Sequence, residues 1–403
     1  MKPKNIQDFE NTIDSNYYGR QKKIGNNIVR VWTTTNHQAV KYQWFDKKNW
    51  NVPIVISAPV PPSPISIATF FDYQIFINES GDGIILWKVL LNGYPNQSGG
   101  VKKLYKVELK NFQVVKMPSS YLDTVNDSNT DLVNVKYAVN SNNELIIVFK
   151  AKNLNDNITR IYKGEYINGI WEMDHLYYYP SSSSTNVSEV GEFVVDINGK
   201  GDIVIVWAQD FVGAGYKNLY AQIKKNGVWL NKETIKTASQ QSGGQYNYSE
   251  LQDTNINMVC EITEQQNVYV GYVAKDYIIS SGSGNIDYDL EIAVWNKSSN
   301  SWNKEELLAN KGNPIEPKAI YVHNNQKLTY LYERLDTLYQ IQKNLVDNNW
   351  GSKVDLTNSF SGIQGLQAFW IGGYDSSQCG IINSFWKVEG TNMTPKIYLS
   401  QYH

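Results

Sequence analysis

Three carboxylates in this 403-residue chain stand where they could do hydrolytic chemistry. Asp210, Asp276 and Glu333 each follow an apolar, β-branched or aromatic run that is typical of a buried strand. Cleavage of a glycosidic bond uses two carboxyl groups, one as an acid and one as a base or nucleophile. The sequence does not give the distances between these carboxylates in the folded protein. We therefore keep glycan cleavage as the alternative hypothesis, and non-catalytic binding as the main one.

Other catalytic patterns are missing from the sequence. The four arginines are Arg20, Arg30, Arg160 and Arg334. They fall at different positions within the predicted strands, so we do not expect them to converge on one pocket. This argues against an arginine clamp for an anionic sugar. Asp287-x-Asp289 lacks the rest of a calcium loop, and the four histidines show no zinc spacing. There is no phosphate-binding glycine loop and no G-x-S-x-G. We therefore expect no metal and no cofactor, and we favour a non-catalytic protein.

The charge balance excludes several partners. The chain has 37 basic and 39 acidic residues, so it lacks the basic surface that nucleic acids select. No apolar run approaches the length of a membrane span, and residues 1–16 lack the apolar core of a signal peptide. The compartment stays unknown: cytoplasmic, or exported by a route other than Sec. Cys260 and Cys379 are too few for a disulfide framework, and we expect free thiols whose redox state is open.

The candidate residues lie within a sequence pattern that recurs along the chain, so the repeated structural unit must position them. An aromatic residue closes an apolar strand at Trp32, Trp87, Phe149, Trp207, Tyr272, Tyr332 and Trp386. A second marker, mostly Leu or Ile before Tyr, follows at Lys41-Tyr42, Leu104-Tyr105, Ile161-Tyr162, Leu219-Tyr220, Glu291-Ile292, Leu338-Tyr339 and Ile397-Tyr398. A third aromatic opens a last strand at Trp50, Phe112, Trp171, Trp229, Trp302 and Trp350. Three ordered markers at a regular spacing are the signature of four-stranded propeller blades.

The clearest unit runs from Val190 to Lys236. Phe193–Ile197 and Ile203–Trp207 form the first two strands, and the second is apolar throughout, as in a strand buried on both faces. Asn218–Lys224 is the third strand, and Asn226-Gly227 is a hairpin turn into a short fourth. This unit predicts an antiparallel meander.

Seven such units predict an all-β fold, a seven-bladed β-propeller of four-stranded antiparallel blades in one domain over 1–403. The predicted blades are 17–57, 65–117, 131–180, 190–237, 254–310, 315–357 and 364–403. The last unit lacks a fourth strand, so we expect residues 6–13 to pair with the C-terminal segment and close the ring.

Long loops gather at one face of this predicted fold. They are 58–64, 92–100, 117–130, 180–188, 238–254 and 276–289, whereas the opposite face has tight Asn- and Gly-rich turns. Recognition is commonly placed on long loops. The predicted ligand-binding residues on the loop-rich face are Tyr94, Lys150, Asp210, Phe211, Tyr216, Tyr246, Tyr248, Tyr277, Glu333, Arg334 and Trp370. They suit a glycan or a protein partner, while nucleic acid and membrane insertion are not expected and the oligomeric state is open. A purely structural role is a third possibility.

The segment GDIVIVWAQDFVGAGYKNLYAQIKKNGVWLNKETI resembles the repeats of bacterial sialidase-superfamily propellers. The chain has no S-x-D-x-G-x-x-W Asp box, so the resemblance implies a fold and not catalysis. Val29-Arg30-Val31-Trp32 and the segments after it also resemble a blade of fucose-binding propeller lectins. Arg30 matches the sugar-binding arginine of those lectins, but Tyr42 stands where their glutamate is expected.

Overall fold

The computed structural model describes an all-β chain. Its described residues are 4–5, 19–24, 27–33, 40–45, 50–57, 63–77, 80–93, 100–116, 130–140, 142, 144–153, 159–167, 170–177, 190–210, 217–237, 239–241, 247–251, 258–280, 283–311, 313–323, 326–335, 337–355, 366–375, 381–388 and 397–400. Within these ranges every regular element is a strand, and no helix could cross a membrane. The chain divides into two compact units, Asp8–Pro180 and Met1–Gln7 with Ser181–His403, which are described separately.

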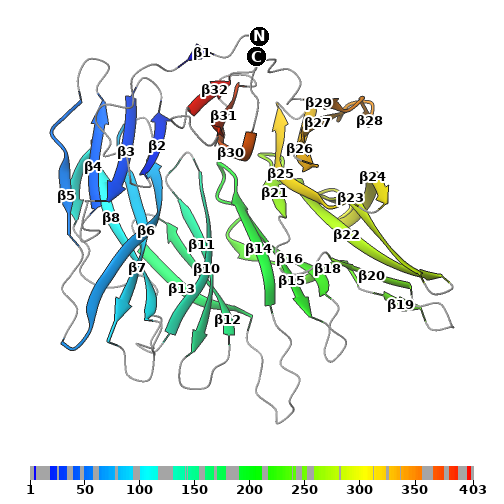
Figure 1. The fold of residues 1–403 in the computed structure, drawn as a ribbon, viewed down its shortest axis with the longest axis horizontal. Coiled ribbons are helices and arrows are strands. Elements are labelled where there is room, and N and C mark those ends of the chain that lie inside the picture. The colour runs from blue at the N-terminus through cyan, green and yellow to red at the C-terminus, as the bar shows by residue number, and fades with distance from the viewer. Residues whose placement is uncertain are drawn as a thin grey trace. The chain divides into compact units, whose positions relative to one another are not determined.

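The unit Asp8–Pro180 holds three four-stranded antiparallel sheets, each with its strands in chain order (Figure 1). Sheet 1 contains β2 (Gly19–Ile24), β3 (Asn27–Thr33), β4 (Val40–Phe45) and β5 (Ile54–Ile56). Sheet 2 contains β6 (Ser66–Ile77), β7 (Gly83–Asn92), β8 (Val101–Lys110) and β9 (Gln113–Lys116). Sheet 3 contains β10 (Thr130–Val139), β11 (Leu145–Asn153), β12 (Thr159–Ile167) and β13 (Ile170–Tyr177).

The second unit holds four antiparallel sheets. Sheet 4 contains β14 (Val190–Ile197), β15 (Ile203–Asp210), β16 (Lys217–Lys225), β17 (Val228–Trp229) and β18 (Glu233–Lys236). Sheet 5 contains β19 (Ser239–Gln241), β20 (Asn247–Leu251), β21 (Val259–Ile262), β22 (Val268–Ser280), β23 (Ser283–Asn296) and β24 (Ser301–Lys311). Sheet 6 contains β25 (Ile315–His323), β26 (Lys327–Arg334), β27 (Thr337–Asn344), β28 (Asn349–Trp350) and β29 (Val354–Asp355). Sheet 7 contains β30 (Leu366–Asp375), β31 (Ile381–Val388), β32 (Ile397–Ser400) and β1 (Lys4–Asn5).

The repeat markers are cross-strand neighbours. The aromatic of the second strand faces the marker of the third strand in every sheet: Trp32–Lys41, Trp87–Tyr105, Phe149–Tyr162, Trp207–Tyr220, Tyr272–Glu291, Tyr332–Tyr339 and Trp386–Tyr398. Four of these pairs have ring centroids 5.0–5.9 Å apart. Such pairs stabilise a sheet beyond the area that they bury. The all-β, propeller-type repeat predicted from the sequence is therefore confirmed, while a closed seven-bladed ring stays a prediction.

Hydrophobic cores lie between sheets 1 and 2, sheets 2 and 3, sheets 4 and 5, and sheets 5 and 6. In sheet 4, Ile203–Trp207 is almost fully buried, as the apolar run predicts. Apolar residues of sheet 4 pack with residues of sheet 5 in one core, and sheets 5 and 6 share a second core. In that second core a Cβ at Gly271 would lie 2.3 Å from the Tyr330 hydroxyl oxygen, so glycine lets β22 approach β26 closely.

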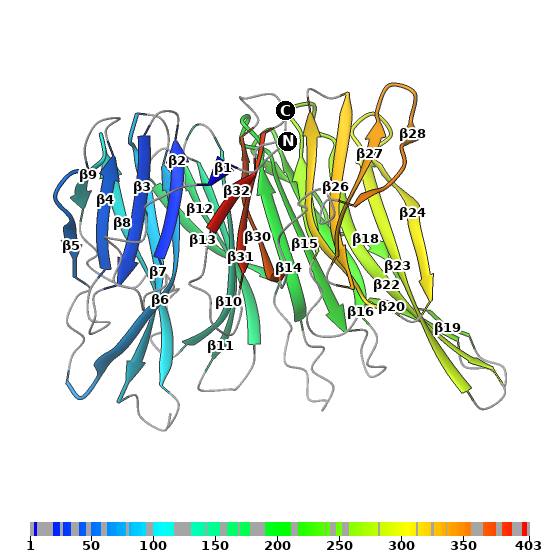
Figure 2. The same ribbon diagram turned by 45° about the horizontal axis from the view of Figure 1, so that its top comes forward.

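Three predicted details differ from the structure. Residues 238–254, expected as a loop between blades, contain β19 and β20; β20 pairs with the C-terminal half of β22, and β19 pairs with β20 (Figure 2). Residues 276–289, expected as a loop, are mostly the paired ends of β22 and β23. Tyr277-Ile278-Ile279 favours strand, and the pairing continues to Ser280 with Ser283. Phe112 lies in a turn with a φ of 62° and precedes its strand.

The N-terminal closing strand is placed earlier than expected. Lys4 pairs with Leu399 and Asn5 with Tyr398, so β1 adds to the edge of sheet 7. The predicted segment 6–13 lies outside the described residues.

Candidate functional site

The structure tests few of the predicted ligand-binding residues. Tyr94, Phe211, Tyr216 and Tyr246 lie outside the described residues. Only the backbone is described for Asp210 on β15, Tyr248 on β20, Asp276 and Tyr277 on β22, and Trp370 on β30. Lys150 lies on β11, in the other unit from most of these residues. The loop-rich site therefore stays a prediction.

The strand register brings two of these residues together. Tyr248 of β20 is the direct partner of Tyr277 of β22, and the neighbouring pair is Ser249 with Asp276. Directly paired residues of antiparallel strands share a face of the sheet. Tyr248 and Tyr277 therefore share one face of sheet 5, while Asp276 takes the other face, together with its partner Asp287 on β23.

Glu333 belongs to an ion-pair cluster with a second glutamate. Lys318 Nζ lies 2.7 Å from Glu316 Oε2 and 2.8 Å from Glu333 Oε2. Glu316 and Glu333 are cross-strand partners on β25 and β26, and the register shifts at Lys318. Since both oxygens contact one nitrogen, they lie within the short separation that retaining glycosidases use. The Lys318 ammonium, however, occupies the space between them.

Arg30 is committed to contacts inside sheet 1. Its Nε donates to Gln43 Oε1 at 2.8 Å, and a second guanidinium nitrogen donates to the same oxygen. The guanidinium also lies 4.1 Å from the Trp50 ring centroid. Tyr42, which stands where the lectins' glutamate is expected, pairs with Val31, and the cross-strand partner of Arg30 is Gln43. With 5% of its surface exposed, Arg30 supports the sheet and is not offered to a ligand.

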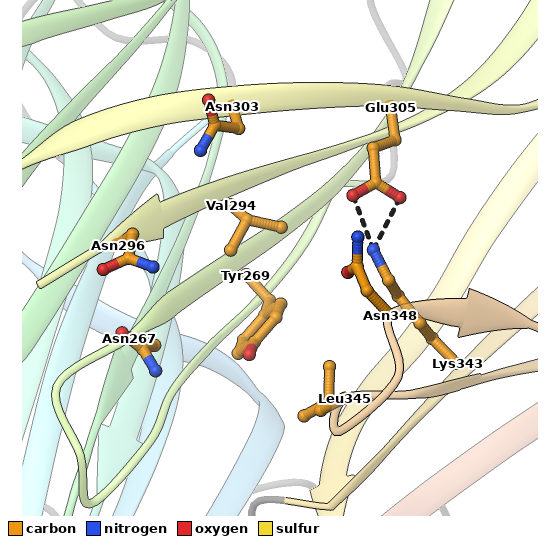
Figure 3. Close-up of a pocket in the computed structure, with 9 residues that line it drawn as sticks. All are labelled: Asn267, Tyr269, Val294, Asn296, Asn303, Glu305, Lys343, Leu345 and Asn348. Carbon is orange, nitrogen blue, oxygen red and sulfur yellow. Dashed lines mark hydrogen bonds and ion pairs between the residues drawn. The ribbon is translucent and has the colours of Figure 1, made fainter. Parts of the chain in front are cut away.

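A cleft between sheets 5 and 6 is the best-described candidate site. Its cavity volume is about 410 Å³. It is lined by Asn267, Tyr269, Val294, Asn296, Asn303, Glu305, Lys343, Leu345 and Asn348. Figure 3 shows Asn267 and Asn296 on one side, Glu305, Lys343 and Asn348 on the other, and Tyr269 and Val294 between them. These residues lie at the ends of the strands joined by tight turns, away from the predicted loop-rich face.

Strand register and turns position the four amides. Asn267 precedes β22, and its Oδ1 accepts from the backbone of Lys297, which fixes the amide at the rim. Asn296 ends β23, where its Oδ1 accepts from Ser298 N at 2.8 Å. Asn303 and Asn348 are exposed, and no described residue hydrogen-bonds their side-chain amides. Each amide offers both a donor and an acceptor to a ligand.

One ion pair lies at the end of the cleft. Lys343 Nζ contacts both oxygens of Glu305, at 2.5 and 2.7 Å, and Trp350 Nε1 donates to Glu305 Oε2 at 2.8 Å. Burial alone would raise the pKa of Glu305, but the hydrogen bonds from Lys343 and Trp350 bring this pKa below its ordinary value. Glu305 is thus a stable carboxylate and an unsuitable proton donor for catalysis.

Tyr269 supplies the floor of the cleft. Its side chain is 6% exposed. Burial, together with the negative charges of Glu261 and Glu305, raises the pKa of Tyr269 to about 12. The phenol therefore keeps its proton at neutral pH.

The sequence prediction missed all nine lining residues. It treated Asn348-Asn349 as plain turn chemistry and looked for recognition only on long loops. The available signal was the recurrence of asparagines at the turns of two successive units, beside the predicted Trp302 and Trp350. What spacing along the chain does not reveal is that sheets 5 and 6 bring these turns to one cleft.

Within the described residues, no group of three or more His, Cys, Asp or Glu side chains is arranged to hold a metal. Cys260 is a free thiol, and burial with the charges of Asp196 and Glu261 holds its pKa well above the ordinary value. Cys379 lies outside the described residues.

Solved structures similar to this chain include three enzymes. An alpha-L-arabinanase of Penicillium chrysogenum complexed with arabinobiose is 10% identical with a TM-score of 0.40, over 97% of this chain and 94% of that one. The NanB sialidase of Streptococcus pneumoniae is 13% identical with a TM-score of 0.36, over 98% and 68%. Prolyl oligopeptidase B of Galerina marginata is 8% identical with a TM-score of 0.49, over 95% of this chain and 48% of that one, so this chain spans about half its length.

These likenesses agree with the predicted resemblance to sialidase-type propellers as a resemblance of fold. With TM-scores below 0.5, however, they carry no argument about activity. No family model matches the chain, and no curated protein matches it.

Proposed function

We propose that this protein binds a glycan, and that the cleft between sheets 5 and 6 is a binding site. The observation that carries the proposal is the set of four asparagines around one cavity of about 410 Å³. A sugar presents hydroxyl groups that each donate and accept, which matches carboxamides better than it matches apolar walls. The volume falls within the range of small-molecule pockets.

A glycan fits this cleft better than a protein surface does. Protein interfaces bury large areas around aromatic anchors, whereas Tyr269 is almost fully buried here and the exposed rim residues are asparagines. Of the two predicted partners, a glycan or a protein, we therefore propose a glycan.

Glycan cleavage is a second candidate because of the Glu316–Lys318–Glu333 cluster. The two carboxylates are close enough for a retaining mechanism, but substrate would have to displace Lys318 from both of them. The cleft itself offers Glu305 as its one carboxylate. Binding without cleavage is therefore the stronger proposal.

A glycan array followed by mass spectrometry of the bound sugars tests both candidates. We expect binding with the glycans recovered intact, and no change in binding for Glu333→Gln. Recovery of shortened glycans from the wild type, and of intact ones from Glu333→Gln, would establish the cleavage candidate. An array without any bound glycan would refute both.

A further inference from the structure

The charges of the cleft restrict the class of glycan that it accepts. Of its nine lining residues only Glu305 and Lys343 carry charge. Lys343 is 4% exposed, and its ammonium contacts both oxygens of Glu305. About one third of the Glu305 side chain remains exposed. The accessible charge of this pair is therefore negative.

An anionic sugar would find no uncommitted cation in this cleft. To bind a carboxylate, Lys343 would have to give up bonds of 2.5 and 2.7 Å and leave its place near the Trp350 ring, 5.4 Å from the ring centroid. Glu305 would then lose its main partner inside a partly buried site, and leaving a charge unpaired there is costly. Even without this exchange, a sugar carboxylate in the cleft would be repelled by Glu305.

Neutral sugars meet no such penalty. The amides of Asn303 and Asn348 are open to ligand hydroxyls, and the carboxylate of Glu305 can accept from a hydroxyl while Lys343 stays bound. We infer that the cleft selects uncharged glycans and discriminates against sialylated and uronic-acid-bearing ones. This inference rests on the proposed glycan binding, and it names the ligand class of the same site.

The test compares neutral sugars with counterparts that carry one negative charge, one pair matched in size and one pair in which the anion adds a sialic acid. Dissociation constants for a neutral disaccharide and its uronate counterpart, and for lactose and sialyllactose, are measured by calorimetry at low and high salt. The proteins are the wild type, Glu305→Gln and Glu306→Gln. Glu306 is an exposed neighbour on β24 that does not line the cleft, so its variant has the same net charge as Glu305→Gln.

We expect the wild type to bind each neutral sugar at least tenfold more tightly than its anionic counterpart. Glu305→Gln keeps an acceptor for Lys343 but removes the negative charge, so it should narrow that ratio at least threefold, and more at low salt. Glu306→Gln should leave the ratio unchanged. Equal or tighter binding of the anionic sugars by the wild type, or equal effects of the two variants, would overturn the selectivity while leaving glycan binding in place. Failure of every sugar to bind would overturn the proposed function itself, and the selectivity with it.

Discussion

At the scale of single residues, two partly buried acids link β14 of sheet 4, β21 of sheet 5 and β25 of sheet 6. Asp196 on β14 accepts a hydrogen bond of 2.8 Å from Ile262 N on β21. Glu261 on β21 accepts from Val322 N on β25 through both oxygens, at 3.0 and 2.9 Å. Burial raises the pKa of Asp196 to about 7, and burial with the charge of Asp196 raises that of Glu261 well above its ordinary value.

Asp196 should make stability depend on pH. Its pKa of about 7 in the folded protein exceeds the value of about 3.9 for an unfolded Asp, so the folded state holds more protons between these values. Its contribution is full below about pH 4 and is lost as pH rises through 7. We expect the free energy of unfolding, measured in urea, to fall by about 2 kcal/mol or more from pH 5 to pH 8.

The matched variant is Asp196→Asn, which keeps an acceptor for Ile262 N but does not ionise. Its free energy of unfolding should fall less over the same pH range, with the remaining slope due to groups such as Glu261. A wild-type slope that the substitution leaves unchanged would show that Asp196 does not titrate in this way.

At the scale of elements, turns hold successive sheets together. Asp202, in the turn before β15, is 1% exposed. Its Oδ1 accepts from Asn226 N in the other turn of sheet 4 at 2.7 Å. Its Oδ2 accepts from Gln266 Nε2 of sheet 5 at 2.8 Å and from Asn198 Nδ2 at 3.1 Å. Three turns from two sheets thus meet at one carboxylate.

Asp202→Ala should lower the free energy of unfolding by about 2 to 4 kcal/mol, because it leaves several buried donors without an acceptor. Asp202→Asn keeps one oxygen for Asn226 N but turns an amino group toward the Gln266 amide, so an intermediate loss is expected. Urea denaturation of the three proteins gives the order. Equal stability of Asp202→Ala and the wild type would mean that these turns do not hold the sheets.

The strands were easier to predict from the sequence than the candidate site. The repeat pairs strands that follow one another along the chain, whereas the cleft combines residues of two separate sheets. Trp207 and Tyr220 mark two strands joined by one hairpin, so their spacing follows from the strand period. The cleft lies between two sheets, where contacts such as that of Gly271 with Tyr330 do not follow from spacing along the chain. The long hairpin of β22 and β23 was mistaken for a loop because Ser and Gly residues at its tip hide the pairing of its flanks.

At the scale of the whole molecule, the predicted ring closure can be tested through β1 and β32. The register pairs Lys4 with Leu399. In a background with Cys260 and Cys379 replaced by serine, Lys4→Cys with Leu399→Cys should form an intramolecular disulfide under mild oxidation, detected as two thiols lost per monomer. Lys4→Cys alone is the control. Two titratable thiols that persist in the folded double variant would contradict this pairing.

The central claim is that the cleft between sheets 5 and 6 binds a neutral glycan. Its most direct test is the dissociation constant of the tightest neutral glycan for the wild type and for Asn303→Ala combined with Asn348→Gly. Glycine suits the φ of 61° at Asn348 and removes the amide without backbone strain. Asn349→Ala, in the same turn but outside the cleft, is the control. We predict a loss of about tenfold or more for the double variant, equivalent to two hydrogen bonds, and none for the control. Unchanged affinity in a folded double variant would contradict the assignment of this cleft.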